Sequence, residues 1–113
     1  MKKAITLFVG IVLMAGSASA QDAPRGDVAK GKTLYVSTGC YECHNYSGAG
    51  SSQGARLISP PTFQRFLAQM RRPSSVMPPY EANVLSDAQV ADIYAYVQTL
   101  PKPPDANSIR LLK

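Results

Sequence analysis

The sequence Cys40-Tyr41-Glu42-Cys43-His44 constrains this chain more than any other stretch. Its two cysteines are the only cysteines among the 113 residues, and His44 is the only histidine. The pattern Cys-x-x-Cys-His is typical of covalent haem attachment, in which the two thiols bond to one porphyrin and the histidine binds its iron. We therefore predict one haem c, held by Cys40 and Cys43, with His44 as an axial ligand of the iron.

Three further interpretations of this motif are open. A thiol–disulfide redox pair is expected beside a βαβ pattern, whereas the segments on both sides of the motif read as helix and Gly-rich loop. A structural zinc site needs four nitrogen or sulfur ligands, and the chain has three cysteine and histidine side chains in total. A plain structural disulfide is the third possibility. Haem attachment is the leading interpretation, since the rest of the chain agrees with it.

Residues 1–20 have the pattern of a secretory signal peptide. Lys2 and Lys3 form a basic start, residues 5–14 are apolar, and Ala18-Ser19-Ala20 is a small-residue cleavage signal. The apolar run is shorter than the roughly 20 residues that a membrane span needs. We expect Sec-type export, cleavage before Gln21 and a periplasmic protein without a stable membrane anchor.

The charge of the remaining chain is modest. Removing residues 1–20 from the 113 leaves 93 residues, enough for one small domain. Two of the 12 basic residues are lost with the signal peptide and all seven acidic residues remain, so 10 basic and seven acidic residues give +3. Arg71-Arg72 is the only adjacent basic pair left, and it reads as the solvated end of a helix, with a role in partner docking as the alternative. A nucleic-acid partner is not expected, because no long run of Lys and Arg occurs.

Apolar residues recur at helical spacing in three segments, two of which carry clear start signals. The first helix is capped by Asp27, ends at Gly39 and has its periodic residues at Val28, Gly31, Leu34 and Tyr35. The second begins at Ser59 or Thr62, ends before Pro73 and carries a one-sided stripe of Phe63, Phe66, Leu67 and Met70. The third opens with the capping box Ser86-Asp87-Ala88-Gln89, closes at Leu100-Pro101 and presents Val90, Ile93, Tyr94 and Val97.

Gly31 is unusual inside a helix, where it costs up to about 1 kcal/mol relative to alanine. A helix usually tolerates such a glycine when another backbone must approach closely. Residues 45–59 read as a long loop that wraps one edge of the haem, and residues 73–80 as an irregular, Pro-rich stretch. With no β alternation and no internal repeat, the chain is predicted to be all-α. Its expected parts are a loose N-terminus at 21–26, one domain at 27–101 and a Pro-rich tail at 102–113.

The second axial ligand of the iron must be soft and free to point at the metal, and Met70 and Met77 are the candidates after the signal peptide. Met70 belongs to the apolar stripe of the second helix, which favours a core role. Met77 lies just before Pro78-Pro79, whose fixed backbone angles hold the chain extended and present one thioether at a defined position. Met77 is therefore the preferred ligand, with Met70 or an open site as alternatives.

With these features together, the chain resembles the class I c-type cytochromes over nearly all of residues 26–101. Gly31 and Tyr35 match the glycine and the aromatic residue of that family's first helix. Ile93 and Tyr96 match the residues of its last helix that cross them. The resemblance implies a small cytochrome c fold of three to four helices around one covalently attached haem.

Gly54-Ala55-Arg56-Leu57 looks like the Gly-Pro-x-Leu of that family, whose second residue accepts the Nδ1–H of the haem histidine through its carbonyl. This chain has Ala55 where proline is usual, so the carbonyl is retained and the loop is expected to be less stiff. The segment Met-Pro-Pro-Tyr and the helix after it resemble small monohaem cytochromes of bacteria, many of which accept electrons from periplasmic dehydrogenases.

The resemblance implies a one-electron carrier rather than an enzyme. It would pass electrons from a donor dehydrogenase to an acceptor oxidase or another cytochrome. Two alternatives stay open: a dedicated cytochrome subunit of a dehydrogenase complex, and a ligand-binding or catalytic haem protein with an open iron site.

Overall fold

The computed structural model describes residues 24–57, 62–102 and 104–112, so the predicted signal peptide lies outside the described residues. Within these ranges four α-helices occur, in the order α1 (Val28–Ser37), α2 (Cys40–His44), α3 (Phe63–Arg71) and α4 (Asp87–Gln98). Two single 3₁₀ turns follow, η1 (Ala106–Ser108) and η2 (Arg110–Leu112). No strand occurs in the described ranges, and the predicted all-α class is confirmed.

The start and the end of α1 follow from its sequence. The side chain of Asp27 accepts a hydrogen bond from the backbone N–H of Lys30 at 3.0 Å, which satisfies one of the free donors of the first turn. Helix α1 ends at Ser37, and Gly39 then adopts φ 77°, the left-handed conformation that turns the chain into α2. The expected apolar stripe is narrower than its spacing suggests, because Val28 is 43% exposed.

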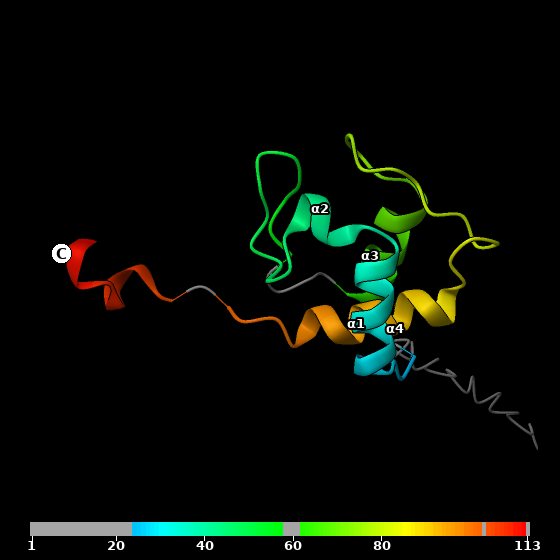
Figure 1. The fold of residues 1–113 in the computed structure, drawn as a ribbon, viewed down its shortest axis with the longest axis horizontal. Helices are drawn as coiled ribbons and strands as arrows, with labels where there is room; N and C mark the ends of the chain where they lie inside the picture. The colour runs from blue at the N-terminus through cyan, green and yellow to red at the C-terminus, as the bar shows by residue number, and fades with distance from the viewer. Residues whose placement is uncertain (1–23, 58–61, 103, 113) are drawn as a thin grey trace, which may run out of the picture.

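Helices α1 and α4 cross, as Figure 1 shows, and Gly31 lies against α4 at this crossing. A Cβ at Gly31 would overlap the carbonyl oxygen of Asp92 and would lie 2.9 Å from the Cβ of Tyr96. Beside this contact, the rings of Tyr35 and Tyr96 meet edge to face with centroids 5.3 Å apart. Gly26, in the segment expected to be loose, also lies against α4, where a Cβ would overlap the Ala91 carbonyl. The close approach expected at Gly31 is confirmed.

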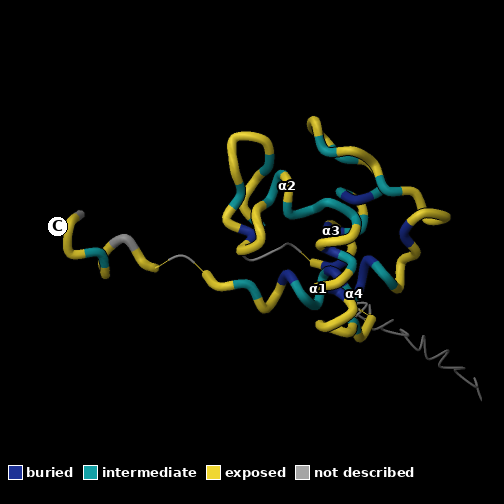
Figure 2. Tube along the Cα trace, viewed as in Figure 1, coloured by how far each residue is buried: buried dark blue, intermediate teal, exposed yellow. Residues whose placement is uncertain are grey.

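Helix α3 packs its stripe against α4, α4 also packs against α1, and the buried residues gather at these contacts (Figure 2). Phe63, Phe66 and Met70 are buried, and Leu67 is half-buried. Helix α4 begins with the expected capping box, in which Ser86 and Gln89 each bond to the other's backbone N–H. Val90, Ile93 and Val97 are fully buried. The helical spacing of apolar residues in the sequence therefore predicts which face of α3 and of α4 packs into the core.

The two long connections lie on the same side of the crossed helices, one beside α2 and the other beyond α3 (Figure 1). Residues 45–57 form the expected loop, and residues 73–80 contain no helix. The segment after α4 leads away from the helices. None of the helices in the described ranges is long and apolar enough to cross a membrane.

Replacing Gly31 by valine tests the crossing. Because the new side chain would meet the backbone of α4 rather than a flexible side chain, we expect a loss of about 1–3 kcal/mol in the free energy of unfolding. Thermal and urea denaturation measure it. Ala29→Val, at an exposed position of the same helix, controls for the helix propensity of valine. Equal stability of the two variants would remove the crossing argument.

Candidate functional site

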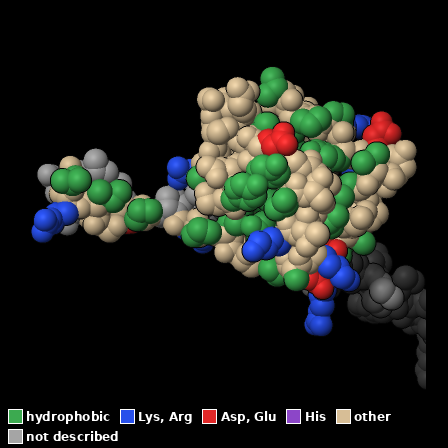
Figure 3. All heavy atoms as spheres, in the orientation of Figure 1, with side chains coloured by type: hydrophobic (Ala, Val, Ile, Leu, Met, Phe, Trp, Pro, Cys, Tyr) green, Lys and Arg blue, Asp and Glu red, His purple; other side chains and the backbone are tan. Residues whose placement is uncertain are grey.

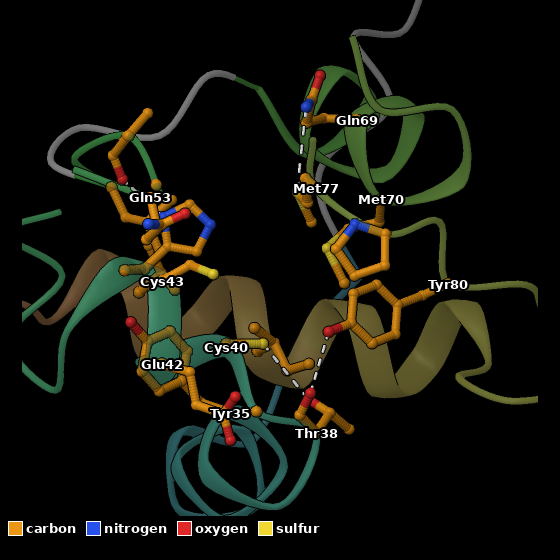
Figure 4. A pocket seen from close by; sticks show the side chains of 18 of the residues that line it. Tyr35, Thr38, Cys40, Glu42, Cys43, Gln53, Gln69, Met70, Met77 and Tyr80 are labelled. Carbon is orange, nitrogen blue, oxygen red and sulfur yellow. Dashed lines mark hydrogen bonds between the residues drawn. The ribbon is translucent and has the colours of Figure 1, made fainter. Parts of the chain in front are cut away.

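A cavity of about 770 Å³ lies between α2, α3 and the two long connections. Its lining includes all four residues expected from the sequence to hold the cofactor, Cys40, Cys43, His44 and Met77. Figure 4 shows Cys43 on one side, Met70, Met77 and Tyr80 on the other, and Cys40 between them. Cofactor sites typically have volumes of about 300–1,000 Å³ and few polar groups on mostly apolar walls. The fold therefore brings residues far apart in sequence to one cofactor-sized space.

His44 is held by the loop that follows α2. Its Nδ1 lies 2.6 Å from the carbonyl oxygen of Ala55, as the resemblance to class I cytochromes implied. Gly54 makes this contact feasible, because a Cβ there would lie 2.7 Å from the carbonyl oxygen of Cys43. Ser51 adds a hydroxyl bond of 2.6 Å to the same carbonyl. The loop thus packs its backbone directly on α2, and proline is not needed to place the acceptor.

The bond to Ala55 also fixes the proton on the imidazole of His44. A carbonyl oxygen can only accept, so Nδ1 must carry the hydrogen. Nε2 then keeps its lone pair in the neutral ring, which is the form that binds metals. A hydrogen-bonded Nδ1 also orients the ring and raises its basicity as a ligand.

Cys40 lies in a half-buried position beside two hydroxyl groups. Its Sγ is 3.3 Å from Oγ1 of Thr38, and Thr38 is in turn contacted by Tyr80. Burial raises the pKa of the Cys40 thiol, so the sulfur is favoured in a neutral form. A thioether is neutral, whereas a thiol–disulfide redox pair depends on a depressed thiol pKa. The local environment of Cys40 therefore suits haem attachment better than redox chemistry at sulfur.

A structural disulfide and a zinc site at the motif also lack support. Cys40 and Cys43 are both free thiols, so this structure forms no disulfide between them. Across the described ranges, no group of three or more His, Cys, Asp or Glu side chains is arranged to hold a metal ion. Zinc would need such a group.

Both candidate methionines line the cavity, but their surroundings differ. Met70 is 3% exposed and belongs to the hydrophobic core with Phe63 and Phe66. Met77 is half-buried at the edge of that core, and its Sδ lies 4.0 Å from Nε2 of Gln69. The core role expected for Met70 agrees with its burial, and Met77 remains the preferred ligand as a prediction.

Tyr80 anchors the segment that carries Met77, a role that the sequence did not reveal. Its backbone N–H donates to the Met70 carbonyl at 2.8 Å, and its carbonyl accepts from Nη1 of Arg71 at 2.6 Å. Its hydroxyl donates to the Thr38 carbonyl at 3.0 Å. Burial raises the pKa of Tyr80, which keeps this hydroxyl protonated as a donor. Three bonds therefore tie the end of the Pro-rich stretch to α3 and to the end of α1.

Arg71 completes this anchor. The expectation that the pair Arg71-Arg72 lies in solvent at the end of a helix is therefore wrong for Arg71. While Nη1 holds Tyr80, Nη2 of Arg71 forms an ion pair with Asp87 at the start of α4. The only sequence signal for this role is the position of Arg71 in the last turn of α3. Periodicity describes which face of a helix is buried, and it does not show that an arginine will reach across to a loop.

Residues 26–97 match the family model described as "Cytochrome C oxidase, cbb3-type, subunit III". This chain belongs to that cytochrome c family. A cytochrome c domain implies covalently bound haem c and electron transfer by it. The cavity fits such a group, since it joins two thiols, an imidazole with a free Nε2 and a thioether around one space.

A solved structure agrees with this fold. Cytochrome cL from Hyphomicrobium denitrificans matches with a TM-score of 0.57 at 19% sequence identity. The match covers 72% of this chain and 51% of that one, so this cytochrome spans about half the length of its structural neighbour. At this identity the likeness shows a shared cytochrome c fold and nothing finer. No curated protein sequence matches the chain.

Tyr80→Phe tests the anchor of the Met77 segment. The substitution keeps the ring and removes the hydroxyl bond to Thr38, so we expect a loss of about 1 kcal/mol and about fivefold faster amide exchange over residues 74–80. Hydrogen exchange followed by mass spectrometry measures this. Tyr46→Phe is the matched control, since Tyr46 is exposed and stacks on Tyr41. The same change in both variants would show that the hydroxyl of Tyr80 has no special role.

Proposed function

We propose that this cytochrome is a periplasmic one-electron carrier with a single haem c and His/Met axial ligation. In this proposal Cys40 and Cys43 form the two thioether bonds, and His44 and Met77 bind the iron. The observation that carries it is that these four side chains, from two separate parts of the chain, line one cavity with Nδ1 of His44 already bonded. When bound, haem c supplies a one-electron couple between ferric and ferrous iron.

The residues of the chain set how readily an electron is accepted. His44 would present Nε2 as a neutral, well-oriented donor, because Ala55 holds the hydrogen at Nδ1. The soft thioether of Met77 favours the reduced iron and raises the potential. Burial between α3, α4 and the loops acts in the same direction, since it disfavours the additional positive charge of the oxidised state.

The ligand set also supports a carrier rather than an enzyme. With His44 and Met77 both in place, the chain would leave no open position for a substrate or oxygen. The anchor at Tyr80 supports this arrangement, because it limits how far the Met77 segment can move from α3. Electrons would enter and leave at the edge of the haem near the cysteines, with no bond made or broken.

The expected partners are a dehydrogenase that donates electrons and an oxidase or another cytochrome that accepts them. Export through the signal peptide predicted at residues 1–20 would place the protein in the periplasm, where such chains operate.

A second candidate is a dedicated cytochrome subunit of a larger redox complex. The description of the matching family, an oxidase subunit, favours it. The same four side chains would hold the haem, and only the lifetime of the association with the partner would differ. Size-exclusion chromatography of the native protein from its own periplasm separates a free carrier from a stable subunit.

The covalent haem can be tested first. In a host able to attach haem c, the exported protein should begin near Gln21, and its intact mass should include one haem. Replacing Cys40 and Cys43 by alanine should give a poorly structured product, because the haem fills the centre of a small core. Circular dichroism checks this loss of helix. Native helix content in the double variant, or a wild type without covalent haem, would contradict the proposal.

The two methionines separate a carrier from a ligand-binding protein. Met77→Ala should remove the sulfur-to-iron charge-transfer band of the oxidised protein, lower the potential and admit carbon monoxide. Met70→Ala is the matched control: it should cost about 2–5 kcal/mol because Met70 is buried, and leave that band in place.

Two outcomes of this pair would overturn the assignment. A band that survives Met77→Ala and disappears in Met70→Ala would make Met70 the ligand. A wild type that lacks the band and binds carbon monoxide readily would favour an open iron site.

A further inference from the structure

Two tyrosine rings stack on each other beside α2. Tyr41 lies within the Cys-x-x-Cys-His motif and Tyr46 follows it closely in the next loop. Their ring centroids are 4.4 Å apart, and the ring planes meet at only 19°. Hydrophobic side chains, a class that includes tyrosine in Figure 3, gather over α2 on the face of the molecule shown there. The pair therefore belongs to the surface next to the cavity, and the proposed electron transfer gives it no role.

The two rings also run in the same direction. Tyr46 raises the pKa of Tyr41, first through the charge its own hydroxyl can carry and then through a hydrogen bond between the two side chains. A stack with its hydroxyl groups together places the ring carbons next to the two oxygens face to face, whereas a head-to-tail stack would separate them. These carbons are the positions at which oxidised phenols couple to each other.

A strained residue holds the second ring in place. Asn45 has φ 65° and ψ 157°, a region of backbone angles that glycine occupies almost alone. Three hydrogen bonds fix it there: its N–H donates to the Tyr41 carbonyl at 2.8 Å, its carbonyl accepts from the Tyr35 hydroxyl at 2.6 Å, and its Oδ1 accepts from the Tyr46 N–H at 2.7 Å. The backbone thus turns Tyr46 back toward the motif in one defined position.

The other aromatic pair that consists of two tyrosines within the described ranges is unsuited to coupling. The rings of Tyr35 and Tyr96 meet edge to face at 62° with centroids 5.3 Å apart, and Tyr35 is completely buried. Tyr46 is instead 59% exposed, so an oxidant in solution can reach its ring.

We propose that Tyr41 and Tyr46 form an oxidative cross-linking site, at which a peroxidase and hydrogen peroxide join the two rings into dityrosine. Each phenol gives up one electron and its hydroxyl proton, and the two radicals form one carbon–carbon bond between the ring positions next to their oxygens. The hydrogen on each of these carbons then moves to the oxygen, which restores both hydroxyl groups. The peptide loses two hydrogen atoms in total, and one hydrogen peroxide accepts them to become two water molecules.

The new bond would act as a covalent clip on the motif. It closes a ring of residues 41–46, which contains Cys43, His44 and the strained Asn45. A covalent link across a short segment restricts the open states of that segment. The clip would therefore oppose local opening around His44 under oxidising conditions, whatever partner the cytochrome serves.

Mass spectrometry of the oxidised holoprotein tests the site. The probe is a plant peroxidase with one equivalent of hydrogen peroxide, applied to dilute protein so that coupling between molecules is slow. Trypsin cuts after Lys32 and Arg56, which leaves both tyrosines in one peptide. We expect this peptide to become two hydrogen atoms lighter, with fragment ions missing between positions 41 and 46.

Phenylalanine variants locate the link. Tyr41→Phe and Tyr46→Phe each keep the ring but remove the phenol, so neither variant should show the lighter peptide. Tyr96→Phe is the matched control, because Tyr96 belongs to the edge-to-face pair. It should cross-link as the wild type does.

A synthetic peptide of residues 33–56, with alanine in place of Cys40 and Cys43, measures coupling without the fold. The folded protein should give about tenfold more of the internal link than this peptide at the same oxidant dose, because the fold holds the two rings in the reactive orientation. Hydrogen exchange then tests the clip: amides of residues 44–48 should exchange about threefold more slowly after cross-linking, with α3 and α4 unchanged.

Three results would overturn the proposal. A wild-type peptide of unchanged mass would show that the stack does not couple. A link found mainly between two molecules, or an equal yield from the synthetic peptide, would show that the fold does not favour the internal bond. Unchanged exchange over residues 44–48 in the cross-linked protein would contradict the role as a clip.

Discussion

The backbone of α1 at Gly31 lies directly against the backbone of α4 at Asp92, and the rest of the domain is arranged around this crossing. Because no side chain separates the two helices, Tyr35 one turn further on is buried completely against Tyr96. The hydroxyl of Tyr35 then donates to the carbonyl of Asn45 at 2.6 Å, immediately after the Cys-x-x-Cys-His motif. One close contact between helices thereby fixes where the end of the motif stands relative to the core.

The cavity depends on two loops that are held by different means. The loop after α2 is placed by close backbone contact, since Gly54 lies against Cys43 and brings the Ala55 carbonyl to His44. The segment with Met77 is placed by polar bonds, which converge on Tyr80 from α3 and from Thr38. Prolines stiffen the second loop but do not attach it to anything. Without Tyr80 and Arg71, a stiff segment would have no fixed position on the domain.

The proposed electron transfer depends on how the chain orients His44 at the cavity. Contacts at the cavity, such as the bond between His44 and Ala55, orient the groups proposed to hold the haem.

Local sequence determined the features that need only neighbouring residues. The motif at 40–44, the cap at Asp27, the capping box before α4 and the core stripe of α3 were all readable, because each rests on short-range spacing or on local hydrogen bonds. The bond between His44 and Ala55 was reached by family resemblance, since nothing in its spacing of 11 residues requires it. The tertiary structure alone decided that Arg71 and Tyr80 hold the Met77 segment and that Gly26 packs on α4. Such contacts join residues whose partners lie on other elements, so their energies appear only once α1, α3 and α4 are packed together.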